Sequence, residues 1–192
     1  ILTNANGEKE YAFIMTDISK FHLINDYWGY ETGTKILNFV LRRMELFSAS
    51  LFVNRYHSDV FVAVLDITGR KSSDVKKQIE EYNRQIIQEI LKTFQINYFH
   101  LNTGIYYLKD TSIPAEQIIS HTNIVREKAK TELSGVCEYN NDIALNERHC
   151  ADTIHSFKSA LKQKEFKIYF QPKICGKDQT IASAEALVRW QR

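Results

Sequence analysis

Proline and glycine are scarce in this chain, with 2 and 7 copies among 192 residues. That scarcity excludes a flexible linker, a fibre and a low-complexity chain, which need far more of both. Charge of one sign is lacking too, because 25 Lys and Arg residues balance 23 Asp and Glu residues. A chain without a broad basic field is not expected to bind nucleic acid.

Long apolar runs are also missing. No stretch comes near the roughly 18 apolar residues that a membrane span requires. We therefore expect no membrane contact by this segment and predict that it is cytoplasmic. This prediction is compatible with a membrane anchor elsewhere in a longer parent protein.

Cysteine is rare, and its three copies, Cys137, Cys150 and Cys175, form no C-x-x-C pair. This spacing argues against a zinc clip or a redox pair and favours reduced thiols. His149 and His155 lie near Cys150, but histidines six residues apart do not suit a metal pair on one helix. Solvated polar residues are favoured over a metal site there.

Apolar patterning predicts that strands and helices alternate over the first part of the chain. The predicted strands are Tyr11–Met15, Leu51–Val53, Phe61–Ile67, Asn97–Leu108 and Val136–Tyr139. The predicted helices are residues 19–28, a helix that begins at Glu31, Val75–Phe94, and a helix from Pro114 to Lys130. The second and third strands should form a β-hairpin. This order predicts an α+β fold, a βαββαβ sheet with helices packed on it.

Residues Asn140–Arg148 (NNDIALNER) are polar and have no apolar period, and we place a domain boundary there. Beyond it, the pattern predicts a helix from Asp152 to Lys164 and the strands Phe166–Phe170 and Ile181–Trp190. A segment of some forty residues cannot enclose a core of its own. The predicted organisation is a first domain over residues 1–142, a linker over 143–150, and an incomplete helix and hairpin over 151–192.

Two acids mark a candidate site. Asp17 follows a predicted strand, and Asp59 lies at the tip of the predicted hairpin. If the strands are neighbours, two unpaired carboxylates meet at one sheet edge, where they suit Mg²⁺. The alternative is a pair of turn aspartates, each bonded to its own backbone, and spacing alone favours that alternative.

Residues 16–34 (TDISKFHLINDYWGYETGT) resemble the opening of GGDEF domains, the diguanylate cyclase family, which reads D-x-D-x-F-K-x-I-N-D-x-x-G-H-x-x-G-D. Residues 55–61 (RYHSDVF) then fall without a gap on that family's R-Y-G-G-D-E-F signature. The resemblance runs from about residue 8 to residue 142, and the predicted strand order agrees with the fold of that family.

A second resemblance begins later in the chain. Tyr169–Lys173 (YFQPK) and Glu185–Trp190 (EALVRW) are similar to the start of EAL domains, the cyclic di-GMP phosphodiesterase family. The resemblance implies that Glu185 is one of several metal ligands, and that Gln171 and Arg189 contact the dinucleotide in an intact parent. The alternative is a partly ordered tail on the first domain.

The GGDEF resemblance implies roles for individual residues. Active members of that family join two GTP molecules across a dimer with two Mg²⁺ ions. By position, Asp17 and Asp59 keep acids of the metal site, Asn25 keeps the residue that reads the guanine edge, and Lys130 keeps a phosphate-binding lysine. Phe61 keeps the last letter of the signature.

Several positions depart from the family pattern, among them Ser134, which stands where the family has an arginine one turn after Lys130. Thr34 replaces a second guanine-reading acid, and His22 replaces a phosphate-binding lysine. Within the signature, His57 and Ser58 replace the two glycines, and Val60 replaces the final acid. These changes remove base recognition, room for phosphates beside His57, and support for a metal, so they predict a catalytically inactive domain.

The family's product-inhibition motif, R-x-x-D, falls on residues 48–51 (SASL), where neither charge is kept. The prediction is an inactive GGDEF domain that senses GTP with Mg²⁺ and regulates a C-terminal EAL phosphodiesterase. Two alternatives remain open, a dimerisation or interaction module that binds no nucleotide and a weakly active diguanylate cyclase. The expected partners are GTP or cyclic di-GMP, an upstream sensor domain, the remainder of the EAL domain and a second copy of the chain.

Overall fold

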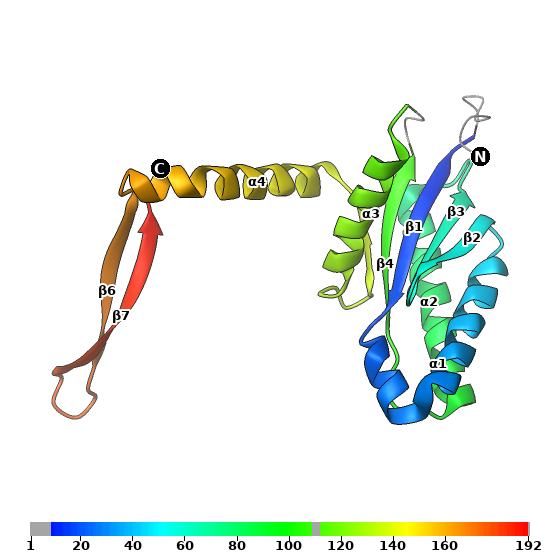
Figure 1. The fold of residues 1–192 in the computed structure, drawn as a ribbon, viewed down its shortest axis with the longest axis horizontal. Helices are drawn as coiled ribbons and strands as arrows, with labels where there is room; N and C mark the ends of the chain where they lie inside the picture. Colours follow the sequence, from blue (N-terminus) through cyan, green and yellow to red (C-terminus); the bar gives the residue numbers. More distant parts are fainter. Residues whose placement is uncertain (1–8, 109–111, 192) are drawn as a thin grey trace. The chain divides into compact units, whose positions relative to one another are not determined.

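The computed structural model describes residues 9–108 and 112–191 (Figure 1). The chain divides into two compact units, Ile1–Tyr139 and Asn140–Arg192. The elements of the first unit are β1 (Tyr11–Ile18), α1 (Phe21–Glu45), β2 (Ser50–His57), β3 (Val60–Asp66), α2 (Ser72–Phe94), β4 (Leu101–Leu108), α3 (Ala115–Ala129) and β5 (Val136–Glu138).

A five-stranded sheet in the order β2-β3-β1-β4-β5 forms the centre of the first unit. The strand β1 lies in the middle and pairs antiparallel with both β3 and β4, whereas β4 and β5 are parallel. Figure 1 shows α1 and α2 on one side of the sheet and α3 on the other. The predicted α+β fold, a sheet with helices packed on it, is confirmed.

Alternation along β1 sends successive side chains to opposite faces of the sheet. Ala12, Ile14 and Ile18 belong to the large core beneath α1 and α2. Tyr11 faces the other way, in a smaller cluster with Ile118 of α3. Because Asp17 has the same parity as Tyr11, it is on the α3 face of the sheet.

Gly29 interrupts α1 with a non-helical backbone, at φ 82° and ψ 156°. Glycine adopts positive φ without a steric penalty, so the helix bends there and continues. This bend explains why the sequence predicts two helices, residues 19–28 and a second from Glu31, where the structure has one interrupted helix.

The hairpin strand β2 is longer than predicted. The polar second half of β2 was expected to form the loop between the two strands. It pairs with β3 instead, with Asn54 opposite Val62 and Arg55 opposite Phe61. Most of β2 is exposed at the sheet edge. An edge strand needs no apolar alternation on its open side, so hydrophobic patterning underestimates its length. The predicted strand from Asn97 is shorter, because β4 begins only at Leu101.

The second unit consists of α4 (Asn141–Lys162), β6 (Phe166–Ile174) and β7 (Ile181–Trp190), with the two strands antiparallel. Residues 143–150, which the sequence analysis predicts as a linker, are helical and lie within α4. Asn140 caps the helix by accepting a hydrogen bond from the amide of Ile143 at 3.0 Å. The unit boundary therefore falls between Tyr139 and Asn140 rather than after residue 142.

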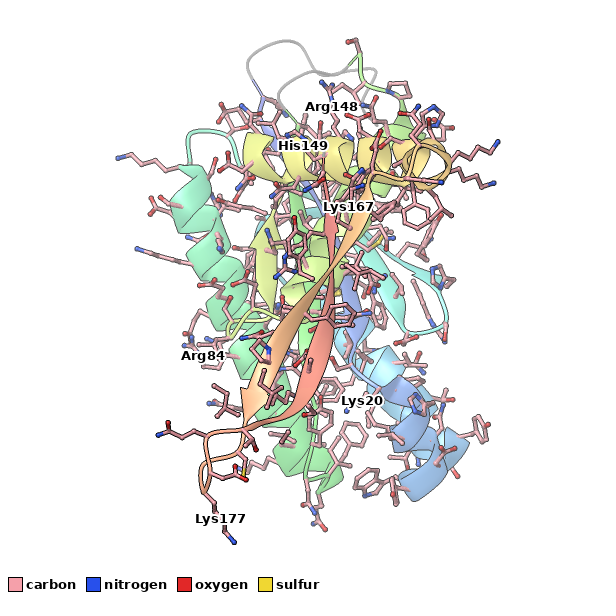
Figure 2. The ribbon with its side chains drawn as sticks, turned by 90° about the vertical axis from the view of Figure 1, so that its left-hand side faces the viewer. Lys20, Arg84, Arg148, His149, Lys167 and Lys177 are labelled. Atoms are coloured by element: carbon pink, nitrogen blue, oxygen red, sulfur yellow. The ribbon has the colours of Figure 1, made fainter. Side chains whose placement is uncertain are left out.

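Few side chains of the second unit are buried. Among its described residues, only Ile143 and Ala160 are buried apolar side chains. Phe157, Phe166 and Trp190 form an aromatic cluster, with Phe166 and Trp190 ring centroids 5.0 Å apart. Figure 2 shows Lys177 in the turn that joins β6 and β7. In the described part of the chain, no helix has both the length and the apolarity to cross a membrane.

Candidate functional site

A cavity of about 760 Å³ opens at the C-terminal end of β1. Its wall combines the β1–α1 connection, the first half of α1, the β2–β3 hairpin tip and the residue that follows α3. Seven residues singled out in the sequence line it, namely Asp17, His22, Asn25, Thr34, Ser58, Asp59 and Lys130. The structure therefore brings them together, and Lys20 (Figure 2) and Arg55 add two further cations to the wall.

Strand pairing places the two acids at the same edge of the sheet. Asp17 is opposite Val60 in the β1–β3 register, so Asp59 immediately precedes the residue that faces Asp17. Asp59 is half-buried and forms no hydrogen bond or ion pair with any other described residue. The expected approach of the two acids to one cavity is therefore present.

The hairpin tip keeps the backbone of a glycine turn although the glycines are gone. Ser58 has φ 45°, a left-handed conformation that glycine adopts without strain and serine adopts at a small cost. Arg55 donates a hydrogen bond from Nε to the carbonyl oxygen of Ser58, which holds the turn closed. His57 is exposed beside Tyr56 and is not part of the cavity wall. The expectation that His57 crowds the phosphates stays a prediction.

Asp17 is not the unpaired acid that the sequence suggested. The residue is 5% exposed, and Asn102 donates to its Oδ1 at 2.7 Å. Arg126 forms an ion pair with Oδ2, and Lys130 Nζ lies 3.5 Å from the same oxygen. The charge of Asp17 is thus already balanced by cations of the chain itself.

Arg126 is the central residue that the sequence analysis missed. It lies within the buried stripe of α3 formed by Ile118, Thr122, Val125 and Ala129, and it is only 8% exposed. Its Nη2 also donates to Asn123 at 2.7 Å. A charged residue inside an apolar helical stripe was the available signal, because such a residue requires a buried partner.

Gly104 of β4 allows α3 to approach the sheet closely enough for this contact. A Cβ at that position would lie 2.4 Å from the carbonyl oxygen of Thr122 and 2.6 Å from the amide nitrogen of Arg126. Both neighbours are backbone atoms and cannot rotate away. The absence of a side chain at Gly104 is therefore a condition for bringing Arg126 to Asp17.

Charges alternate at the end of α3. Lys130 donates to Glu127 Oε2 at 2.7 Å, and Arg126 forms a further ion pair with Glu127. The hydrogen bond from Lys130, aided by the charge of Arg126, lowers the pKa of Glu127. Glu127 therefore stays ionised and restrains both cations close to Asp17.

The expected base-reading residues lie on α1. Asn25 packs against Gly33, where an added Cβ would lie 2.0 Å from its Oδ1, so Gly33 provides the room for this amide. The hydroxyl of Thr34 donates a hydrogen bond to the carbonyl oxygen of Tyr30 at 2.9 Å, so the hydroxyl proton is used within the helix. Thr34 therefore lacks the two acceptor oxygens that a carboxylate offers to a guanine edge.

Val60 is part of the apolar packing rather than of the cavity wall. It is 4% exposed and clusters with Met15 and Val62. A valine in this position supplies neither a metal ligand nor a proton acceptor. The site therefore has no second acid adjacent to Asp17 on β3.

The donor set does not fit a resident Mg²⁺. Mg²⁺ needs hard oxygen ligands with free lone pairs, whereas both oxygens of Asp17 accept hydrogen bonds or ion pairs. Arg126 and Lys130 would also repel a divalent cation at this carboxylate. No group of three or more His, Cys, Asp or Glu side chains among the described residues could hold a metal ion.

The residues singled out in the second unit share one face of the β6–β7 ribbon. Gln171 is directly opposite Glu185, and Arg189 is opposite Lys167 four pairs further along. Glu185 forms an exposed ion pair with Lys173 at 3.5 Å. The metal and dinucleotide roles expected for Glu185, Gln171 and Arg189 stay predictions.

Comparisons with known proteins agree with the fold of the first unit. Two curated relatives are a bifunctional diguanylate cyclase/cyclic di-GMP phosphodiesterase, MucR of Pseudomonas aeruginosa, and the signaling protein YkoW of Bacillus subtilis. MucR is 20% identical over 190 residues, covering 96% of this chain and 27% of its own length. YkoW is 25% identical over 181 residues, covering 90% of this chain and 22% of its own. The chain thus spans about a quarter of the length of these relatives.

Solved structures of GGDEF domains share the fold of the first unit. The GGDEF domain of DgcB from Caulobacter crescentus, in complex with c-di-GMP, matches with a TM-score of 0.59 and 17% identity, over 69% of this chain and 80% of that one. The active GGEEF domain of a diguanylate cyclase from Vibrio cholerae matches with a TM-score of 0.55 and 22% identity, over 69% and 85%. Residues 2–134 match the family model described as "Diguanylate cyclase, GGDEF domain". This match covers well over half of the chain, which therefore belongs to the GGDEF domain family.

Proposed function

We propose that this chain is a regulatory GGDEF domain of a cyclic di-GMP signalling protein, and that it binds GTP without converting it. The observation that carries the proposal is the cavity itself, which places Asn25 on one side and Lys20, Arg55 and Lys130 around it. An amide suits a guanine edge, and cations suit phosphates. The cavity thus keeps side chains suited to bind both the guanine base and the phosphates of GTP.

The same cavity supports the loss of catalysis. Cyclisation needs activation of a hydroxyl and stabilisation of charge that develops on phosphorus-bound oxygens. The position of the final signature acid is occupied by Val60 in the apolar packing, and Asp17 is committed to Arg126. A bound nucleotide would then meet Asp59 as the single unpaired acid of the described wall, with neither Asp17 nor residue 60 available to accept its proton.

The output of the domain is proposed from the relatives. Two of them are named for cyclic di-GMP phosphodiesterase activity, MucR and the protein NbdA of Pseudomonas aeruginosa. We place the second unit at the start of an EAL phosphodiesterase domain, in which Glu185 would bind metal and Gln171 and Arg189 would contact the dinucleotide. Binding of GTP in the GGDEF cavity would then change the rate at which the EAL domain of the parent protein hydrolyses cyclic di-GMP.

A thermal-unfolding titration with GTP tests the proposal. At 1 mM GTP and a dissociation constant of about 0.1 mM, binding stabilises the fold by about 1.4 kcal/mol, which raises the midpoint by a few degrees. Asn25→Ala should lose most of that shift. Asn38→Ala is the matched control, because Asn38 is an exposed amide on the same helix and outside the cavity.

Chromatography of the same samples decides the catalytic part. We expect no cyclic di-GMP after long incubation with GTP and Mg²⁺. Product that grows in proportion to protein concentration would support a weakly active cyclase instead. Absence of any thermal shift with GTP would support an interaction module that binds no nucleotide.

A further inference from the structure

We infer that Arg126 takes the place of a divalent cation in this cavity, so that the site binds a nucleoside triphosphate without Mg²⁺. The nucleotide part rests on the proposed function, whereas the exclusion of the metal rests on the geometry of Asp17 alone. Arg126 is a positioning residue here, because it does not line the cavity itself.

The geometry gives Arg126 the position of a counter-ion to Asp17. The guanidinium is buried behind the cavity wall and forms an ion pair with Oδ2 of Asp17. It is fixed from its other side by Asn123 and Glu127. A guanidinium stays protonated under all ordinary conditions, so this counter-charge is permanent and cannot dissociate as a metal ion can.

This pairing changes the charge that a ligand meets. The ionised residues of the wall are Lys20, Arg55 and Lys130 against Asp17 and Asp59. Arg126 and Glu127 add one cation and one acid behind the wall, so four cations stand against three acids, and Asp59 is the one acid of the described wall without a partner. Phosphate groups are therefore attracted directly, and no divalent ion is needed to screen Asp17 from them.

The same pairing opposes metal binding. A divalent ion at Asp17 would lie next to two cations, Arg126 and Lys130. The carboxylate oxygens of Asp17 that would bind the ion already contact Asn102, Arg126 and Lys130. Repulsion between like charges is weakly screened in a partly buried site. Binding of Mg²⁺ would have to displace Arg126, which is buried because α3 packs closely against the sheet at Gly104.

The first experiment uses Mn²⁺ alone as the probe and measures metal binding by water-proton relaxation. Mn²⁺ prefers the same hard oxygen ligands as Mg²⁺ and is paramagnetic. We expect no difference between the wild-type chain and Asp17→Asn, because Asp17 binds no metal. Arg126→Met should gain a binding site, and the double variant Asp17→Asn with Arg126→Met should lose it again.

The second experiment measures GTP affinity by calorimetry in EDTA and in excess Mg²⁺. The wild-type affinity should be at least as high in EDTA as in Mg²⁺. Arg126→Met exposes the charge of Asp17 to the phosphates, so its affinity in EDTA should fall roughly tenfold and recover partly with Mg²⁺. Arg84→Met is the control, since Arg84 pairs with Glu81 on the exposed face of α2 (Figure 2) and should leave both affinities unchanged.

Each result decides the inference. Metal binding by the wild-type chain that Asp17→Asn abolishes would overturn it, and this comparison needs no change at Arg126. A folded Arg126→Met variant that behaves as the wild type in both experiments would also overturn it. If no variant binds GTP, the proposed function fails while the Mn²⁺ comparison still decides whether Arg126 excludes the metal.

Discussion

Two buried polar networks lie on opposite faces of the same strand, one residue apart. On the α2 face, Thr16 and Thr103 share a hydrogen bond at 2.8 Å, and Asn83 donates to Thr103 at 2.9 Å. On the α3 face, Asp17 joins Arg126 and borders the cavity. The first network is neutral and closed, whereas the second is charged and ends at an open pocket.

The difference separates a structural role from a binding role. Neutral groups that satisfy one another lose little when water is excluded. Buried charges lose much more hydration and gain little stability over apolar packing. A charged network beside a cavity is therefore better explained by what the cavity binds than by the stability of the fold.

The largest expected effect comes from Gly104→Ala, which pushes α3 away from β4. The new methyl group would overlap backbone atoms of Thr122 and Arg126, so we expect a loss of about 3 kcal/mol or more in the free energy of unfolding. Urea denaturation measures it. Gly176→Ala is the control, because Gly176 has open space around it and should cost little. Equal midpoints for the two variants would contradict the close approach of α3.

The next effect is that of Asp17→Asn, which keeps the shape of the side chain but removes its charge. The buried guanidinium of Arg126 would lose its main partner, and we expect a loss of about 2 kcal/mol in urea denaturation. Adding Arg126→Met should return part of that loss, because neither charge is then left alone. Strictly additive effects would show that the two residues are not coupled.

A smaller loss is expected from Asn83→Ala on the neutral face. It leaves Thr103 without one hydrogen bond while Thr16 still contacts it, so we expect about 1 kcal/mol. GTP binding by this variant should equal that of the wild type. Weaker GTP binding would contradict the separation between the two faces.

The smallest effect is a pH dependence from His121. Burial lowers the pKa of His121, and its Nδ1 is buried without a partner among the described residues. Below the ordinary histidine pKa of about 6.5 the unfolded chain binds more protons, so stability falls as the pH falls. We expect a loss of less than about 1 kcal/mol between pH 7.5 and 5.5.

His121→Phe tests this pH dependence. The new ring can keep the stacking on Tyr139, where the centroids are now 4.3 Å apart. Unfolding midpoints of the two proteins, followed from pH 7.5 to 5.5, should diverge as the pH falls. Parallel curves would show that His121 takes no part in the pH dependence.

Periodic patterns in the sequence predicted the sheet and its helices, because burial of one face is a local property of spacing. The cavity residues could be placed as well, since strand ends and hairpin tips meet once the strand order is known. Arg126 could not, because its partner Asp17 lies 109 positions away in the sequence. The helical state of residues 143–150 was missed because an exposed helix has no apolar period to detect.

The left-handed turn at Ser58 bears on whether the lost signature could return. The backbone already has the shape that a glycine would adopt, so Ser58→Gly requires no rearrangement and relieves strain. Val60 is different, because a carboxylate there would have to leave the apolar contacts with Met15 and Val62. The change at Ser58 can therefore be reversed by one substitution, whereas the change at Val60 is fixed by the apolar packing around that side chain.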